Sequence, residues 1–203
     1  MKERPILFSA PMVRAILDGS KTQTRRVAKK VVSVHAKTGE ALSNIDSAGL
    51  RVLCPYGQPG DRLWVRETFM GWYNTADGAF SHAAAYRADG YELEHGEKWQ
   101  PSIHMPRAAS RITLEITGVR VERLKDISPS DCEAEGVRRL PLQEGALNPW
   151  YTGDVDAGLE LHSRSTIGAY HKLWEKINGA GAWDANPWVW VIEFKRIEGG
   201  AAC

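Results

Sequence analysis

The sequence predicts a mixed α+β domain, and three stretches carry that prediction. Residues 112–121 alternate between apolar and polar side chains, which is the period of a half-buried strand. Residues 167–177 repeat apolar side chains every three to four positions, as an amphipathic helix does. Residues 128–136 begin with Ser-Pro and end with Gly, the signals that start and stop a helix. Further strands are predicted at 6–8, 62–69 and 188–197, and a further helix at 11–17.

Length and composition bound the class of protein. The chain has 203 residues with 43% hydrophobic content, which suits one domain with one core. Its net charge of +1 gives no overall field that selects nucleic acid, so such a contact would need a local patch. Its three cysteines are widely spaced and form no CxxC pair, which argues against a disulfide framework or a zinc cluster. This cysteine pattern favours a reducing cytoplasm, and no apolar run has the length of a membrane span or of a signal core.

The irregular parts of the chain are expected to be insertions in that domain. We predict a single domain over 1–203, with insertions around 28–56, 70–110 and 138–165. Compact domains seldom need connections of this length between regular elements. The Gly- and Ala-rich end, 198–203, is expected to fray.

A polar segment follows the predicted helix at 11–17. Gly19 stands where a helix ends with a positive φ, and Lys21 and Thr24 then lie close together on a departing strand. A lysine can act as base for a hydroxyl nucleophile when burial or a nearby cation lowers its pKa. Arg25 and Arg26 can supply that cationic neighbourhood or bind an anionic or polar ligand. The alternative is a solvated basic turn.

Two glutamates also stand out from their surroundings. Glu67 shares the apolar face of its predicted strand with Leu63 and Val65, so it either enters the interior, where it needs a partner, or turns to solvent at the strand end. Glu135 falls on the last turn of a helix, where the helix dipole disfavours a negative charge. A tertiary partner such as Lys21 would explain its place, and exposure to solvent is the alternative.

Three short motifs resemble one known family. They are Gly19-x-Lys21-Thr22-x-Thr24-x-Arg26, the run Asp131-Cys132-Glu133-Ala134-Glu135-Gly136-Val137, and the run Trp188-Val189-Trp190-Val191-Ile192-Glu193-Phe194. In this order they resemble the ASCH (activating signal cointegrator homology) domains of the PUA-like superfamily, especially phage and prophage members. The resemblance implies a PUA-like small mixed β-barrel with flanking helices. Ala108 departs from the pattern, since the phage-type relatives lead us to expect Trp there.

The resemblance also implies an activity. Small bacterial ASCH proteins similar to this chain are amidohydrolases that remove the acyl group from N4-acetylcytidine. Carried over, Thr24 would be the nucleophile, Lys21 the base, and Glu135 the group that orients Lys21 or relays a proton. Activation of water by Lys21 and Glu135 fits equally well. Substrate contacts are expected from Arg25 and Arg26, from Trp64 or Tyr86 stacking on the base, and from Glu67 accepting a hydrogen bond.

Other functions remain open at this stage. The sequence has no HExxH, Walker loop, dinucleotide glycine pattern or G-x-S-x-G elbow, so no metal or other cofactor is expected. PUA-like domains also bind RNA or modified bases without chemistry, and a basic groove here would draw on Arg25, Arg26, Lys29, Lys30, Arg107 and Arg111. A ribonuclease is a third possibility. The expected partner is a modified nucleoside, or RNA or modified DNA, with no membrane; the oligomeric state stays open.

Overall fold

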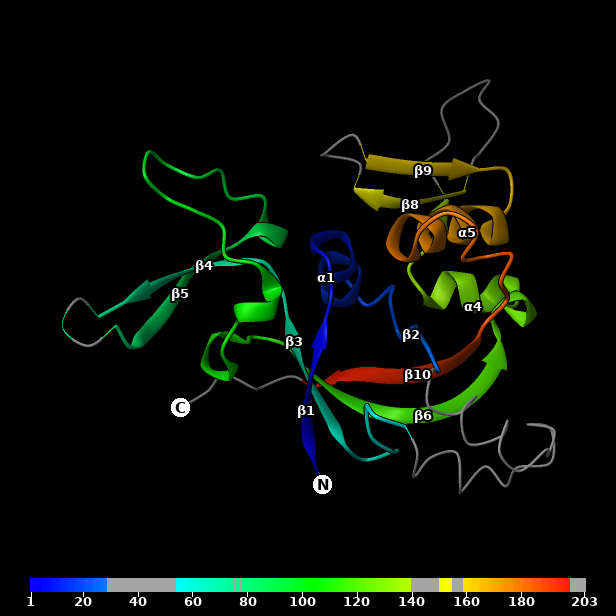
Figure 1. The fold of residues 1–203 in the computed structure, drawn as a ribbon, viewed down its shortest axis with the longest axis horizontal. Helices are drawn as coiled ribbons and strands as arrows, with labels where there is room; N and C mark the ends of the chain where they lie inside the picture. Colours follow the sequence, from blue (N-terminus) through cyan, green and yellow to red (C-terminus); the bar gives the residue numbers. More distant parts are fainter. Residues whose placement is uncertain (29–53, 75, 77, 140–149, 155–158, 198–203) are drawn as a thin grey trace.

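A five-stranded mixed sheet forms the centre of the molecule (Figure 1). The computed structural model describes residues 1–28, 54–74, 76, 78–139, 150–154 and 159–197. The strands lie in the order β1 (Glu3–Leu7), β3 (Arg62–Arg66), β6 (Thr113–Arg123), β10 (Trp188–Ile197) and β2 (Gln23–Val27). β1 runs parallel to β3, and the other neighbours are antiparallel.

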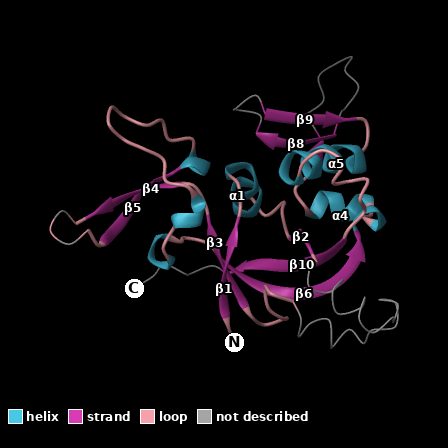
Figure 2. Ribbon diagram, viewed as in Figure 1, coloured by secondary structure: helices cyan, strands magenta, loops and turns pink. Residues whose placement is uncertain are grey.

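Helices and two small sheets surround this centre (Figure 2). The helices are α1 (Ala10–Leu17), α4 (Pro129–Ala134) and α5 (Thr166–Asn178). One small sheet is the hairpin of β4 (Phe69–Tyr73) and β5 (Phe80–Tyr86); the other joins β7 (Arg138–Arg139), β8 (Trp150–Asp154) and β9 (Leu159–Ser163). Single 3-10 turns occur at η2 (Arg87–Asp89), η3 (Ser102–His104), η4 (Arg107–Ala109) and η5 (Leu124–Asp126).

The strand β10 separates two hydrophobic cores. Successive side chains of a strand point to opposite faces of the sheet. Trp190 and Ile192 therefore enter the core shared with α1, whereas Val189 and Val191 enter the core beneath α4 and α5. This alternation decides which face of the neighbouring strands carries each polar side chain.

The structure confirms the α+β class. The predicted helix at 11–17, the helix at 128–136 and the last strand all form close to their expected bounds. Residues 138–165 were expected to be irregular, and that expectation is wrong for β8 and β9, which pair as an antiparallel hairpin over α5. Residues 29–53 and 140–149, which hold much of two expected insertions, lie outside the described residues.

The predicted closed barrel does not form within the described part of the chain. β1 and β2 are the two edges of the sheet, and no backbone ladder joins them there. A side chain links these edges instead: Arg26 of β2 donates from Nη2 to the backbone oxygen of Leu7 at 2.6 Å. Within the same described residues, no helix has the length and apolar character needed to span a membrane.

Candidate functional site

The turn between α1 and β2 places Lys21 beside the end of α4. Gly19 has a φ of 81°, as predicted, and this left-handed conformation lets the chain reverse after α1. The amide of Lys21 then donates to Ala15 at 2.8 Å, and the amide of Thr22 donates to Ala134 at 2.9 Å. Lys21 and Glu135 form an isolated antiparallel bridge as a result.

The helix α4 holds Glu135 by capping at both ends. Ser128 and Asp131 form a capping box at its start, in which each side chain accepts from the other residue's backbone amide. Gly136 ends the helix with a φ of 98°. Its tight turn leaves Glu135 at the end of α4, facing Lys21 across the bridge.

Lys21 and Glu135 form a fully buried ion pair. The Lys21 Nζ atom donates to Oε2 of Glu135 at 2.7 Å and to the backbone oxygen of Glu135 at 2.8 Å. The two side chains are 0% and 3% exposed, which rules out a solvent-facing Glu135. Burial lowers the pKa of Lys21; Glu135 opposes this shift, and the charges of Arg26 and Arg25 add to it. The pair therefore contains an amine that is easier to deprotonate than an ordinary lysine.

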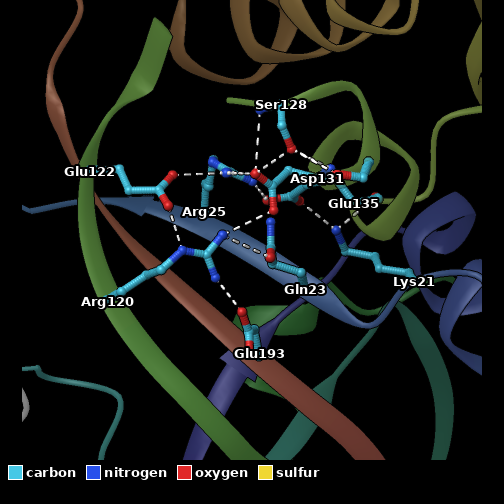
Figure 3. Close-up of polar contacts among 10 residues, drawn as sticks. Lys21, Gln23, Arg25, Arg120, Glu122, Ser128, Asp131, Glu135 and Glu193 are labelled. Carbon is cyan, nitrogen blue, oxygen red and sulfur yellow. Dashed lines mark hydrogen bonds and ion pairs between the residues drawn. The ribbon is translucent and has the colours of Figure 1, made fainter. Parts of the chain in front are cut away.

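The other oxygen of Glu135 faces a second cation (Figure 3). Arg25 pairs with Val191 of β10, so it projects toward the core beneath α4 rather than toward α1. Its Nη1 lies 3.5 Å from Oε1 of Glu135, and its Nη2 lies 3.0 Å from Glu122 and 3.2 Å from Asp131. The Arg25 guanidinium is thus occupied by carboxylates rather than held free for a ligand.

A hollow lies beside this pair at the free edge of β2. Its volume is about 440 Å³, a figure that includes open solvent at its mouth. Its walls are Met12 of α1, residues 24–27 of β2, Glu135, and one side of α5 (Tyr170, Leu173, Trp174, Ile177 and Asn178). Glu135 is the residue that both lines the hollow and contacts Lys21.

Thr24 lines the same hollow but makes no described hydrogen bond to Lys21. It pairs with Ile192 and lies on the opposite face of β2 from Arg25. The described contacts include no hydrogen bond from its hydroxyl to Lys21 or Glu135. No described residue forms a hydrogen bond with this hydroxyl.

Three residues that line the hollow each carry a buried N–H group without a partner among the described residues. They are Nε of Arg25, Nε of Arg26 and Nε1 of Trp174, all buried and without a hydrogen bond in the part of the chain described. A buried donor left unpaired costs about 1–3 kcal/mol, so native proteins keep few of them. These three atoms are closed to solvent, so they are unpaired inside the protein and are not presented to the hollow.

The remaining residues expected at the site lie elsewhere. Glu67 is buried and accepts two hydrogen bonds from Arg111, at 3.0 and 3.1 Å, and Arg111 stacks on Tyr86 at 3.9 Å. Trp64 lies on the face of β3 away from the core, where the guanidiniums of Arg66 and Arg107 stack on it. The described contacts join none of Trp64, Glu67 and Tyr86 to Lys21, Thr24 or Glu135.

Three of the six basic residues expected to line a nucleic-acid groove are paired with carboxylates. Arg107 pairs with Glu3 at 2.9 Å, and Arg111 pairs with Glu67 and Asp89. Arg25 is held by three carboxylates, as described above, while Lys29 and Lys30 lie outside the described residues. The described residues also contain no group of three or more His, Cys, Asp or Glu side chains placed to hold a metal ion.

Sequence reasoning missed the groups that surround the candidate triad. Tyr170 and Trp174 were assigned to a core helix, yet both line the hollow.

The charged residues around Arg25 were missed as well. Asp131 lies four residues before Glu135, a spacing that puts both carboxylates on one side of a helix and could have indicated that they act together. Arg120 and Glu122 share a strand face at a spacing of two, but only the register with β10 brings them to Arg25.

Comparisons with known proteins leave the family open. No family model matches the sequence, and no curated protein matches it. Among solved structures, the chain is similar to an ASCH domain from Lactobacillus crispatus JV V101, with 12% identity and a TM-score of 0.38. The match covers 96% of this chain and 79% of that one. At that TM-score the likeness assigns neither a family nor an activity.

Proposed function

We propose that this protein is an amidohydrolase that removes an acyl group from an N4-acylated cytosine nucleoside or a related modified base. One observation carries the proposal: the buried Lys21–Glu135 pair opens, through Glu135, onto a hollow that Thr24 also lines. The motif resemblance to ASCH amidohydrolases, which rests on these same residues, supports the choice of substrate.

The reaction follows from the roles of these groups. The Thr24 hydroxyl attacks the amide carbonyl, and its proton passes to the Lys21–Glu135 pair. Glu135 connects the two sites, because it contacts Lys21 and also lines the hollow. The tetrahedral intermediate collapses, the C–N bond breaks, and the pair returns the proton to the departing N4 amine. Water then attacks the Thr24 ester in the same way, which frees the carboxylic acid and restores the hydroxyl.

Burial supplies the conditions that this chemistry needs. A lysine acts as a base only when it is neutral, and burial with two neighbouring guanidiniums moves the pKa of Lys21 in that direction. The intermediate carries a negative oxygen, which Arg26 or a backbone N–H can stabilise. The aromatic rings of Tyr170 and Trp174 on α5 give the hollow an apolar wall suited to a planar base.

The test is release of cytidine from N4-acetylcytidine by the pure protein, followed by liquid chromatography. The informative variant is Thr24→Val, which removes the hydroxyl and keeps the shape of the side chain. Thr22→Val is its matched control, because Thr22 is two residues away and exposed. We expect Thr24→Val to reduce release to background, Thr22→Val to leave it unchanged, and Thr24→Ser to retain it.

Mass spectrometry and the cytidine-release assay together distinguish attack by Thr24 from attack by activated water. A covalent acyl-Thr24 intermediate adds the mass of the acyl group to the protein, which mass spectrometry detects after rapid quenching. Full activity of Thr24→Val together with loss in Lys21→Met would assign the attack to water activated by Lys21 and Glu135. A folded wild-type protein that releases no cytidine would refute the proposal.

A further inference from the structure

A second layer of charged side chains lies beneath α4 and is not used in the proposed reaction (Figure 3). The register of the sheet explains why it gathers there. Val191 of β10 pairs with Arg25 on one side and with Arg120 on the other, and Val189 pairs with Glu122. These side chains therefore share the face covered by α4, which contributes Asp131 from above.

The two guanidiniums of this layer share their carboxylates. Asp131 gives Oδ2 to Arg25 at 3.2 Å and Oδ1 to Arg120 at 2.9 Å. Glu122 likewise gives Oε2 to Arg25 and Oε1 to Arg120. Each carboxylate thus bridges both arginines with one oxygen apiece, so neither arginine can shift without moving the other's partners.

Arg120, the more exposed of the two arginines, also contacts two further side chains of the sheet. Arg120 donates to Glu193 and, at 3.3 Å, to Oε1 of Gln23. Glu193 lies at a β-bulge opposite Gly118, where an added Cβ would come within 2.6 Å of its Oε2. The absence of a side chain at residue 118 therefore makes room for the Glu193 carboxylate that holds Arg120.

We propose that Arg25 and Arg120 are positioning residues, and that they fix the Glu135 carboxylate so that its Oε2 stays on Lys21. Arg25 acts directly, by occupying Oε1 of Glu135, and Arg120 acts through the two shared carboxylates. The proposal rests on the proposed function for its effect on activity. It reassigns Arg25, which the sequence suggested as a substrate contact.

The cluster of Arg25, Arg120, Glu122 and Asp131, which we call the brace, has chemistry that suits this role. Arginine stays protonated throughout the working pH range, so the brace keeps its charge while Lys21 changes protonation. The groups that face Lys21 are Glu135 of α4, Arg25 and Arg26 of β2 and the ring of Phe8, with Tyr170 of α5 beyond Glu135. Among these, Glu135 favours the charged amine and the two guanidiniums disfavour it. Loss of Arg25 should therefore raise the titration midpoint of Lys21.

The test uses two remote variants and one control in the full-length protein. Arg120→Met removes the outer guanidinium, and Gly118→Ala displaces Glu193 without changing any charge. Arg123→Met is the control, because Arg123 lies on the same strand but contacts Asn186 and Trp188 instead. We expect both remote variants to lower kcat for N4-acetylcytidine about ten- to a hundredfold with little change in KM, since misplaced catalytic groups cost about that much.

A second readout does not depend on activity. In protein labelled with ¹⁵N-lysine, NMR follows the side-chain nitrogen of Lys21, assigned by its loss in Lys21→Arg. We expect the signal and its midpoint to change in Arg120→Met and Gly118→Ala, to move to higher pH in Arg25→Met, and to stay as in wild type in Arg123→Met. Arg120→Lys should restore part of the wild-type behaviour.

The two readouts keep the two proposals separate. If the wild-type protein hydrolyses nothing, the proposed function fails, and the Lys21 signal alone decides whether the brace exists. If Arg120→Met does not fold, Gly118→Ala and Arg120→Lys decide. A Lys21 signal and a kcat in the remote variants that match those of Arg123→Met would overturn the positioning role.

Discussion

Glu135 and Glu67 are both buried carboxylates that face a cation, and the two clusters differ in what that cation can do. Glu135 faces Lys21, whose side chain is 0% exposed and whose burial lowers its pKa. Glu67 faces Arg111, which binds both of its oxygens, is 27% exposed and reaches on to Asp89. A lysine can lose its proton, whereas an arginine does not.

The difference separates a reactive pair from a structural one. The Glu67 cluster joins η2 to β3 and the loop before β6, and Arg111 packs flat on Tyr86. It accounts for a carboxylate on the apolar face of β3 without any chemistry. The Glu135 pair borders a hollow that Thr24 also lines, and no described residue forms a hydrogen bond with the Thr24 hydroxyl. A buried glutamate alone is therefore a poor indicator of a site, and its partner and its access to a cavity are more informative.

The largest expected effect comes from removing each cation in turn. Lys21→Met should lower the rate of cytidine release by about 10²–10⁴, the usual contribution of a general base. Arg111→Met should leave the rate nearly unchanged. Both variants should lose stability, by about 3–5 kcal/mol where a buried pair is broken and by less at Arg111, where water reaches the site. Urea unfolding and kcat on the same samples check this, and equal loss of rate in both variants would contradict the distinction.

The sequence made part of this contrast predictable. The turn at Gly19 and the capped helix before Gly136 follow from local signals, and these two features place Lys21 against Glu135. The partner of Glu67 did not follow, because Arg111 lies 44 residues away and no local pattern links them. The face of Arg25 was also beyond local reasoning, since it depends on the register between β2 and β10. Pairing across the sheet, rather than propensity, decided these positions.

The pH dependence of stability should sharpen the comparison on the alkaline side. The pKa of Lys21 in the folded state lies below the ordinary lysine value of 10.5, so between these two pKa values the unfolded chain binds more protons. Stability attributable to Lys21 should therefore rise as the pH approaches 10.5 and fall as the pH drops through the folded pKa. The free energy of unfolding of wild type minus that of Lys21→Met should increase from pH 7 to about 10. A constant difference would mean that Lys21 titrates normally.

Glu67 should show the opposite sign on the acid side. Burial raises its pKa above 4.5 although Arg111 opposes the shift, so the folded state binds the extra proton. The stability that Glu67 contributes is then present below pH 4.5 and is lost as the pH rises through the folded pKa. The Gln side chain of Glu67→Gln cannot titrate, so the variant's free energy of unfolding should rise relative to that of wild type as the pH rises. Urea titrations from pH 4 to about 8 test this, and a gain of wild type over the variant would reverse the sign.

The smallest effect concerns the cap that holds α4 under the reactive pair. Ser128→Ala removes the hydroxyl that accepts from the amide of Asp131 and should cost about 1 kcal/mol of stability. Hydrogen bonds from Ser128, with the charges of Arg25 and Arg120, hold the pKa of Asp131 at about 2 despite its burial, so the variant should also raise that pKa. Ser165→Ala removes the equivalent cap of α5 and is the matched control. Both should lose similar stability, but only Ser128→Ala should lower kcat, because only α4 carries Glu135. Equal kcat in the two variants would show that α4 tolerates a loosened cap without moving the pair.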